Sequence, residues 1–258
     1  MRFAINGFGR VGRTLLRVYA SREDARAKLT LAAINEIADA DTVVHLARYD
    51  SNYGRYPGEI ARAGSSLVID HSSVPLSHVA EVAVLPWRQH KIDLVLECNG
   101  AFTDRMTAEQ HLQAGATRVL FSQPAESDVD ETIVYGVNTD SLSAEMTVVS
   151  AASCTTNAVV PVLATLSAAV GIEAATITTI HALMNDQPVL DVYHHTDLRK
   201  TRAASQSIIP VDTGLAVGIE RILPELSGKL SAHALRVPTT KVSAIELTVA
   251  TDRICTSE

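Results

Sequence analysis

A glycine-rich turn near the N-terminus constrains the fold of this chain more than any other feature. The segment Gly7-Phe8-Gly9-Arg10-Val11-Gly12 has the spacing G-x-G-x-x-G. It follows an apolar strand pattern at residues 2–6 and opens a helical pattern at residues 10–21. A second apolar strand ends at Asn35-Glu36, at the distance that the dinucleotide-binding fingerprint requires. The sequence therefore predicts a βαβ unit that binds a dinucleotide.

Each residue of this fingerprint has a physical role. Gly7 permits the tight turn, Gly9 lets the backbone approach the pyrophosphate, and Gly12 lets the helix and the strand pack closely. Glu36 is expected to accept hydrogen bonds from the ribose hydroxyls, and its charge repels a 2′-phosphate, which favours NAD over NADP as the cofactor. The alternative is a glycine-rich turn beside a surface glutamate, and the strand and helix that flank the turn weigh against it.

The whole chain predicts two domains of different construction. Up to residue 150, apolar strands alternate with helices, as in a doubly wound fold. Residues 151–258 combine long strands with few helices, as in an α+β domain. We therefore expect an α/β chain in which an NAD-binding Rossmann domain (1–150) precedes an α+β catalytic domain (151–258).

The apolar patterns also place the individual elements. The first helix is expected to turn Val11, Leu15, Leu16 and Val18 towards the core. A polar loop is expected at 185–211, and loops of such length usually have a function. The expected strands are 2–6, 29–35, 67–69, 74–76, 92–97, 118–122, 146–149, 172–181, 232–237 and 243–251, and the expected helices are 10–21, 39–48, 107–116, 157–170 and 213–223.

Charge and cysteine content exclude several classes of protein. The 258 residues include 22 Lys plus Arg and 29 Asp plus Glu, and the net charge of −7 offers no general basic field for nucleic acid. The three cysteines, Cys98, Cys154 and Cys255, are sparse and odd in number, which favours a reducing compartment over a disulfide framework. We see no signal peptide and no apolar run of membrane-spanning length. We expect a cytoplasmic protein that binds no nucleic acid, no membrane and no metal.

Cys154 is the candidate nucleophile because it stands where a strand ends and a helix begins. Unpaired N–H groups and the positive end of the helix dipole favour a thiolate there, and a thiolate is the form that attacks a carbonyl carbon. A buried structural cysteine is the alternative, but the hydroxyl and amide groups around Cys154 are not the apolar neighbours that such a residue needs. Cys98, at the end of the strand 92–97, fits that structural role instead.

Several motifs together resemble the glyceraldehyde-3-phosphate dehydrogenase family, over nearly the whole chain to about Thr251. The run Cys-Thr-Thr-Asn at 154–157 is very specific. Within the family the chain is most similar to the erythrose-4-phosphate dehydrogenases, at Ala33–Glu36, at 203–213 and at Met184. The glycolytic enzymes usually have a threonine at that position, which helps to hold the substrate phosphate, and a thioether cannot replace that contact. The other segments that match the family are Ile5–Arg10, Thr178–His181, Asn185–Gln187, Asp197–Arg199, Ile208–Pro210 and Leu235–Thr239.

The resemblance implies NAD-dependent oxidation of a phosphorylated aldose. Cys154 would attack the aldehyde, and His181 would raise the thiolate fraction and take the hydroxyl proton as hydride leaves for the nicotinamide. With erythrose 4-phosphate, water then releases 4-phosphoerythronate, a precursor for pyridoxal phosphate synthesis. The alternative is a glyceraldehyde-3-phosphate dehydrogenase, in which inorganic phosphate accepts the acyl group. A hypothesis from another class is an NAD-binding remnant without turnover.

The resemblance also assigns anion and cofactor contacts. Arg236 and Asp186 match the site of the substrate phosphate. Lys200 stands where the family usually has an arginine, and it lacks the bidentate fork of that residue. A plain surface-loop role is the alternative for each of these polar residues. The second anion site is matched by Ser153, Thr155, Lys200, Thr213 and Gly214, and further cofactor contacts are expected from Arg10, Val11, Asn99, Gly100 and Ser122.

Members of the family continue beyond the last match, so we expect the second domain to be incomplete relative to the family. The last strands of the sheet and a terminal helix would then be missing, which leaves the strand at 243–251 with an unpaired edge. The resemblance implies a homotetramer, and the shorter second domain puts that assembly in question.

Overall fold

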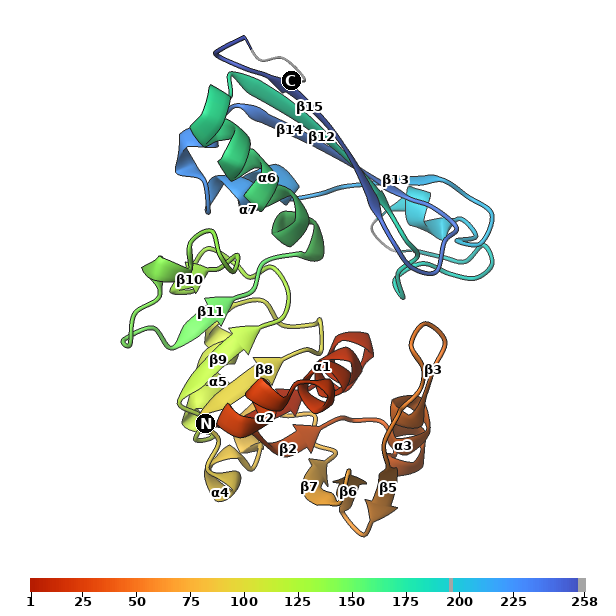
Figure 1. Cartoon of the computed structure of the whole chain (residues 1–258). Helices are drawn as coiled ribbons and strands as arrows, with labels where there is room; N and C mark the ends of the chain where they lie inside the picture. The colour runs from red at the N-terminus through yellow and green to blue at the C-terminus, as the bar shows by residue number, and fades with distance from the viewer. Residues whose placement is uncertain (195–196, 255–258) are drawn as a thin grey trace. The chain divides into compact units, whose positions relative to one another are not determined.

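The computed structural model describes residues 1–194 and 197–254, so Cys255 lies outside the described residues. The chain divides into two compact units, one of Met1–Ile133 with Thr139–Ser153 and one of Val134–Asn138 with Cys154–Glu258. Each unit has its own main sheet (Figure 1). None of the helices in the described segments combines the length and the apolar character that crossing a bilayer requires.

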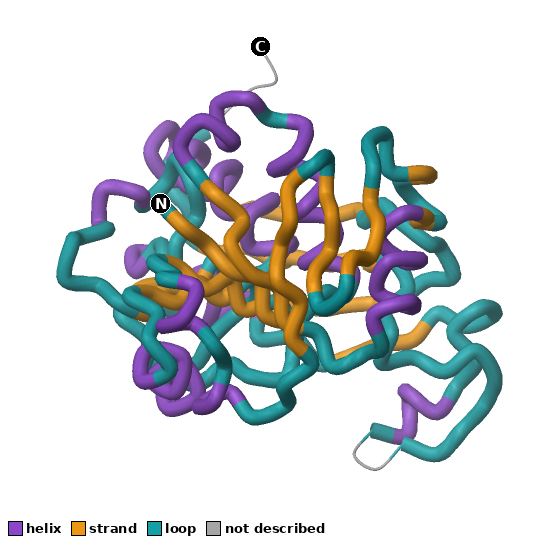
Figure 2. The backbone as a smooth tube through the Cα atoms, turned by 90° about the horizontal axis from the view of Figure 1, so that it is seen from below, coloured by secondary structure: helices purple, strands orange, loops and turns teal. Residues whose placement is uncertain are grey.

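The first unit is built around a large, mainly parallel sheet. Its strands are β1 (Arg2–Asn6), β2 (Thr30–Asn35), β5 (Ile60–Ala63), β6 (Ser66–Ile69), β7 (Ser72–Ser77), β8 (Leu94–Glu97), β9 (Arg118–Phe121), β10 (Glu131–Thr132) and β11 (Val148–Ser150), and a hairpin of β3 (Tyr49–Asp50) and β4 (Gly54–Arg55) lies apart. In the described residues the order is β10-β11-β9-β8-β1-β2-β7-β6-β5. All pairs from β10 to β7 are parallel, whereas β6 pairs antiparallel with both β7 and β5. Figure 2 shows β1, which begins at the N label, between neighbouring strands.

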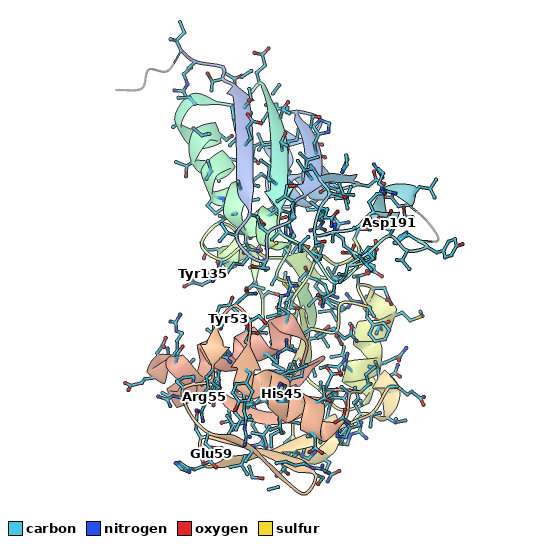
Figure 3. The ribbon with its side chains drawn as sticks, turned by 90° about the vertical axis from the view of Figure 1, so that its right-hand side faces the viewer. His45, Tyr53, Arg55, Glu59, Tyr135 and Asp191 are labelled. Carbon is cyan, nitrogen blue, oxygen red and sulfur yellow. The ribbon has the colours of Figure 1, made fainter. Side chains whose placement is uncertain are left out.

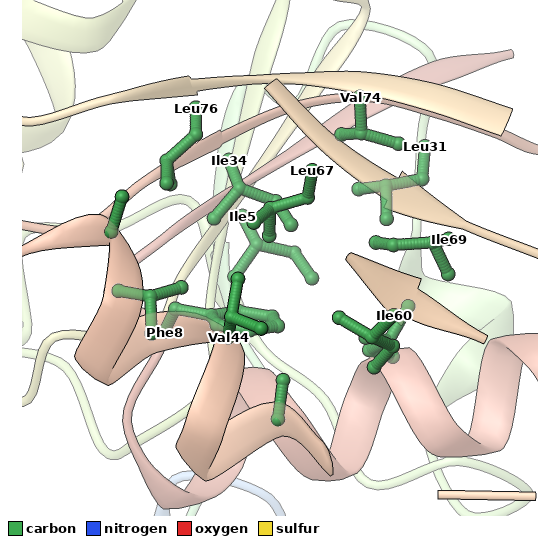
Figure 4. Packing of buried hydrophobic residues seen from close by; sticks show 14 of the residues in the cluster. Ile5, Phe8, Leu31, Ile34, Val44, Ile60, Leu67, Ile69, Val74 and Leu76 are labelled. Atoms are coloured by element: carbon green, nitrogen blue, oxygen red, sulfur yellow. The ribbon is translucent and has the colours of Figure 1, made fainter. Parts of the chain in front are cut away.

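Helices on both faces make this sheet doubly wound. Ile5 packs with Leu16 and Val44 in one apolar cluster, and Figure 4 shows Ile5 and Val44 within it. Its neighbour Ala4 packs with Val82 in another cluster, and because side chains alternate along a strand, the two clusters lie on opposite faces. The helices are α1 (Arg10–Ser21), α2 (Glu23–Lys28), α3 (Ala40–Arg48), η1 (Val82–Val84), α4 (Trp87–His90), α5 (Arg105–Gln113) and η2 (Thr139–Ser141).

The order of the strands creates a topological switch point at β1. The strand β2 lies on one side of β1 and β8 lies on the other, so the connections leave in opposite directions. Open α/β sheets bind ligands in the crevice at the carboxyl ends of such strands. Here the three strands end at Asn6, Asn35 and Glu97, which are 3%, 4% and 0% exposed. Buried polar side chains therefore mark the place where a ligand is expected.

The second unit is a smaller mixed sheet with its own helices. Its elements are α6 (Cys154–Val170), β12 (Ala174–His181), η3 (Leu198–Thr201), β13 (Ile209–Val211), α7 (Leu215–Glu220), η4 (Pro224–Leu226), β14 (Leu230–Arg236) and β15 (Ala244–Ala250). The order in the described residues is β13-β14-β12-β15, with β14 parallel and β15 antiparallel to β12. Figure 1 shows α6 and α7 along one face of this sheet. The mixed sheets and helices of the structure confirm the fold class expected from the sequence, α/β with a Rossmann-like unit first.

The prediction for the buried face of α1 was partly wrong. Leu16 is buried as expected, but Val11 and Val18 are 42% and 47% exposed. The fully buried residues of this helix are Gly12 and Leu16, one turn apart. Because α1 contacts the core along only a narrow stripe of its surface, Val11 and Val18 on either side of that stripe remain exposed to solvent.

The segment 185–211 is not the continuous loop that its polarity predicts. It contains the turn η3 and the strand β13, in which Ile209 and Val211 are buried and Pro210 between them is exposed. Residues 195–196 within this segment lie outside the described residues. The strand β5 was missed as well, because only Ile60 of its residues is buried and the apolar signal is weak.

Candidate cofactor site and active site

The glycine-rich turn packs directly against the loop that follows β8. Gly7 has φ +87°, and a Cβ on it would lie 2.5 Å from the Asn99 Cα. A Cβ on Gly12 would overlap the Gly7 carbonyl oxygen. At Gly9, by contrast, a Cβ would meet no atom within 4 Å. Two of the glycines therefore let the chain pack onto itself, and the third leaves bare backbone open to a ligand.

A hollow of about 310 Å³ lies at the carboxyl ends of β1, β2 and β8. Glu36 lines this hollow, and its carboxylate accepts hydrogen bonds from the N–H groups of Phe8 (2.7 Å) and Ala38 (3.1 Å). These bonds hold the negative charge beside the glycine-rich turn. The lining residues are Asn6, Gly7, Gly9, Asn35, Glu36, Ile37, Val79, Ala80, Val82, Cys98, Asn99, Ala101 and Phe102.

The structure brings together only some of the residues that the sequence places at the cofactor. Gly7, Gly9, Glu36 and Asn99 line the hollow. Lining residues that the sequence analysis missed are the strand-end amides of β1 and β2 and the apolar residues after β2, β7 and β8. These residues could have been predicted from the sequence, because they lie at or just after the carboxyl ends of parallel strands, where such sheets bind ligands. The expected residues that are not in the lining are Arg10, Val11, Gly12, Gly100 and Ser122.

Cys98 is a packing residue, as the sequence indicates. It is 8% exposed, and burial raises the pKa of its thiol to about 12. A hydrogen bond with Ser122 opposes this rise, and the charge of Glu97 adds to it. Cys98 therefore stays a thiol and is no nucleophile at neutral pH.

Cys154 is the first residue of α6 and is exposed. Its Sγ atom lies 3.6 Å from His181 Nε2 and 4.0 Å from Thr155 Oγ1. Two residues earlier, Ala152 has φ +57°, a left-handed conformation that is costly for a residue with a Cβ. A strained turn immediately before an exposed sulfur is typical of a nucleophile held at the entrance of a helix.

His181 ends β12 and contacts two groups through Nδ1. This atom lies 2.7 Å from the Ala182 carbonyl oxygen and 2.7 Å from Arg236 Nη1. A protonated Nδ1 donates to Ala182, which leaves Nε2 free to take a proton on the side of the sulfur. An unprotonated Nδ1 accepts from Arg236, and Nε2 then carries the proton. The position of Arg236 therefore decides which nitrogen of His181 can act as a base.

Arg236 is the register partner of His181 on the neighbouring strand β14. Burial lowers the pKa of its guanidinium, and the charges of Asp186 and Cys154 oppose that shift. Its Nε atom is buried and has no hydrogen-bond partner within the described residues. A half-buried cation with an unsatisfied donor fits an anionic ligand.

The residues expected at the anion sites lie in three places. Lys200 binds Asp186, with Nζ 3.3 Å from Oδ2, so the lysine pairs with a carboxylate that the resemblance places at the substrate phosphate. The Thr213 hydroxyl accepts a hydrogen bond from Leu215 N, and Gly214 is the N-cap of α7. Ser153 and Thr155 flank Cys154 at the start of α6. The resemblance had placed Lys200 only in the second site, and its bond to Asp186 is a contact that the sequence did not suggest.

Family models match both ends of the chain. The NAD-binding domain of glyceraldehyde 3-phosphate dehydrogenase matches residues 1–105. The C-terminal domain of the same family matches residues 153–258. The chain is built from the two domains of the glyceraldehyde-3-phosphate dehydrogenase family. The second match runs to the last residue, beyond Thr251, near which the motifs of the sequence had predicted the resemblance to end.

The family identifies the cofactor as NAD, and the residues of the first unit fit it. Bare backbone at Gly9 is open to a pyrophosphate, and the Glu36 carboxylate stands beside it with lone pairs for ribose hydroxyls. The family also supports an NAD-dependent oxidoreductase. Gly7, Gly9, Glu36 and Asn99 are the residues of the expected set that would hold the cofactor in the hollow.

Proposed function

We propose that this protein oxidises D-erythrose 4-phosphate to 4-phospho-D-erythronate with NAD, through a thioester on Cys154. The proposal depends above all on the contact between the Cys154 sulfur and His181 Nε2 at 3.6 Å. An exposed sulfur at a helix start beside an imidazole is the arrangement that covalent aldehyde chemistry needs. NAD, when bound, accepts the hydride from the thiohemiacetal carbon.

The residues of the second unit account for the proton transfers. The Cys154 thiolate adds to the aldehyde carbon, and the oxygen takes a proton to give a thiohemiacetal. His181 Nε2 then takes the hydroxyl proton, and the carbon becomes a thioester. That proton then passes from Nε2 to solvent, which restores the base. Nε2 takes a proton from the attacking water as the water adds to the thioester, and returns it to the departing sulfur, so that the acid and the thiol are released. An anion that draws Arg236 away from His181 Nδ1 would favour the tautomer in which Nε2 is the base.

Arg236 and Met184 support the choice of substrate. The unsatisfied Nε of Arg236 supports a phosphorylated substrate. Met184 is 38% exposed and offers no donor to a phosphate, in contrast to the threonine that the glycolytic enzymes usually have. Because that donor is lost, the phosphate group would have to be bound by other residues, which favours a longer sugar phosphate as the substrate.

Steady-state kinetics with two aldehydes test the proposal. We expect NADH to form with a higher kcat/KM for erythrose 4-phosphate than for glyceraldehyde 3-phosphate, and without added inorganic phosphate. The variant Met184→Thr should move the ratio towards glyceraldehyde 3-phosphate, and Cys154→Ala should form no NADH. A higher kcat/KM for glyceraldehyde 3-phosphate in the wild type would reverse the substrate assignment. A folded wild type that binds NAD and forms no NADH with either aldehyde would support the remnant without turnover.

We also propose that the protein assembles as a homotetramer. Large apolar side chains are exposed between β12 and β13, the segment that Asp191 marks in Figure 3. Single exposed apolar residues are common on monomers, but a concentration of them within one segment favours an interface. Light scattering should give four times the chain mass for the wild type and a lower mass for Leu190→Asp. A monomeric wild type would refute the assembly. These side chains are Val189, Leu190, Val192, Tyr193, Leu198 and Ile208.

The remaining expectations stay predictions. They are the cytoplasmic location, the absence of nucleic-acid and membrane partners, the role in supplying a pyridoxal phosphate precursor, and the boundary near residue 150.

A further inference from the structure

A carboxylate is buried at the carboxyl end of β8, beneath the cofactor hollow. Glu97 and His111 of α5 are both 0% exposed. Glu97 Oε2 accepts hydrogen bonds from Asn6 Nδ2 (2.6 Å) and from His111 Nε2 (2.8 Å), and Oε1 accepts one from Asn99 N (2.9 Å). The chemistry on Cys154 uses none of these groups. A buried carboxylate is costly to maintain, so its retention calls for a reason.

The ring of His111 is neutral, which leaves Glu97 without a cationic partner among its contacts. Trp87 Nε1 donates to His111 Nδ1 at 2.9 Å, and an indole N–H can only donate. Nδ1 therefore accepts and carries no proton, so the single proton of the ring is on Nε2, facing Glu97. Every group that contacts the carboxylate of Glu97 is an N–H donor. A protonated carboxyl would carry an O–H donor with no acceptor among these partners, so the arrangement fits the ionised form, in which both oxygens only accept.

Glu97 fixes the direction of a chain of amides that lines the hollow. Because Asn6 must turn its NH2 group to the carboxylate, its oxygen is left to accept from Asn35 Nδ2, at 2.8 Å. The oxygen of Asn35 in turn accepts from Ser77 Oγ (2.8 Å) and Val79 N (3.0 Å). The backbone N–H of Val79 cannot reverse its role, and neither can the carboxylate. The two ends thus allow only one orientation for each of the two amides between them.

The same carboxylate anchors the loop on which the glycine-rich turn rests. Its bond to Asn99 N holds the backbone that a Cβ on Gly7 would meet at 2.5 Å. Backbone hydrogen bonds from Cys98 N to Asn6 O (2.7 Å) and from Gly7 N to Asn35 O (2.9 Å) join the same three strand ends. Asn6, Gly7, Asn35 and Asn99 all line the hollow. One buried group therefore contacts or orients polar residues from each strand that forms the hollow.

We propose that Glu97 is the positioning residue of the NAD site: its ionised carboxylate, held by neutral His111, fixes the Asn6 and Asn35 amides and the Asn99 loop in the orientation that the cofactor meets. The inference concerns NAD binding alone and does not depend on which aldehyde is oxidised.

The variant Glu97→Gln tests the proposal because it keeps the shape and removes the charge. The new NH2 group must face an N–H donor, from Asn6 and His111 or from Asn99. If the side-chain amides of Asn6 and Asn35 both rotated by half a turn, the NH2 group of Asn35 would face the N–H of Val79, and two donors would again meet. We expect the dissociation constant for NAD, measured by titration calorimetry, to rise about tenfold, roughly the loss of one hydrogen bond.

Val95→Ala is the matched control, on the same strand and also 0% exposed. It should lower the thermal midpoint by leaving a cavity, yet change the dissociation constant less than about twofold. If both variants weaken NAD binding in proportion to their loss of stability, the role of Glu97 is only structural and the proposal fails. If Glu97→Gln binds NAD as the wild type does, the proposal fails as well.

Nitrogen-15 NMR of the wild type without NAD tests the network even if Glu97→Gln does not fold. We expect His111 to show an unprotonated Nδ1 and a protonated Nε2. In Trp87→Phe the donor to Nδ1 is lost, and we expect both tautomers to appear and NAD binding to weaken by less than about fivefold. A wild-type spectrum with a proton on Nδ1 would overturn the assignment of Glu97 as the acceptor that orders the network.

Discussion

The cofactor hollow of the first unit and the Cys154 site of the second unit differ in how fully their polar groups are bonded. At the hollow, the lining residues Asn6 and Asn35 and the carboxylate of Glu97 beneath them are almost completely buried and share hydrogen bonds of 2.6–2.8 Å. At the second site the Cys154 sulfur lies 3.6 Å from His181 Nε2, and Arg236 has a buried nitrogen without a partner in the described part of the chain.

This difference follows from what each site must do. A cofactor that binds in one orientation is served by groups that are fixed beforehand, because no ordering cost remains at binding. The proposed nucleophile and the arginine proposed to bind phosphate would have to keep bonding capacity for groups that arrive and leave during the reaction. The polar atoms without partners at the second site are therefore suited to bind reacting groups. The fully bonded network at the first site is suited to hold a cofactor in one orientation. Changes in the two units should accordingly separate turnover from cofactor binding.

The largest effect is expected for Cys154→Ala. Without the sulfur no thioester can form, and kcat/KM should fall by about 10⁴-fold or more, as for the loss of other nucleophiles. NAD binding should change far less, because Cys154 is not among the residues that line the cofactor hollow. Intact mass of wild-type enzyme quenched during turnover should show an acyl adduct, and trypsin mapping should place it on Cys154. Product formation with no adduct on that sulfur at any time would refute the mechanism.

His181→Gln should have the next largest effect. The amide occupies a similar volume but cannot take the hydroxyl proton, so kcat should fall by about 10²–10⁴-fold. The change should be smaller in the KM of the aldehyde, since Arg236 remains. Stopped-flow measurement of NADH formation checks this. A large rise in KM with kcat intact would show that His181 acts in binding and not as the base.

Gly9→Ala should weaken NAD binding without loss of stability. The structure has no atom within 4 Å of the added methyl group, so the fold should accept it. The methyl group stands where backbone is expected to approach the pyrophosphate, and we expect the dissociation constant for NAD to rise about tenfold. Gly7→Ala is the comparison, because its methyl group meets Asn99 backbone and should destabilise the unit itself. Unchanged NAD affinity in Gly9→Ala would show that the pyrophosphate does not bind at this turn.

The smallest effect on turnover and on NAD binding is expected for Asp130→Asn in the first unit, which should change stability alone. Burial would raise the pKa of Asp130, but hydrogen bonds from Val148 N, Arg105 and Thr147 N outweigh it and lower the pKa to about 2. A carboxyl whose pKa is lowered by folding stabilises the protein above its unfolded pKa near 4, and loses that effect as the pH falls through about 2. Urea unfolding at neutral pH should show a loss of ~2 kcal/mol in the variant. The difference should shrink between about pH 4 and pH 2, and a difference independent of pH in that range would exclude this origin.

The fold was largely predictable because its local signals agree with its topology. The turn at Gly7–Gly12 and the alternation of strands and helices define the doubly wound unit. The exposure of Val11 and Val18 was not predictable, because how wide a stripe of α1 is covered depends on tertiary packing. The same holds for β13, whose three residues gain their regular structure only by pairing with β14.

For the candidate sites, residue types in motifs were predictable and pairings across the fold were not. Cys154 and His181 are far apart in sequence, and the motifs suggested that they meet. Nothing in the sequence separates Glu97 from any acidic residue at a strand end, because its partners Asn6 and His111 lie on other elements. The bond between Lys200 and Asp186 was hidden for the same reason. Such contacts depend on sheet order and helix placement, which local patterns do not specify.

The contrast between the sulfurs of Cys98 and Cys154 has a practical consequence for covalent labelling. In the described portion of the chain, Cys98 is buried and kept as a thiol, whereas Cys154 is exposed and lies beside an imidazole. Iodoacetamide or hydrogen peroxide should therefore modify position 154 well before position 98. Inactivation by such electrophiles and oxidants should follow single-hit kinetics, and a reversible aldehyde analogue should protect against it.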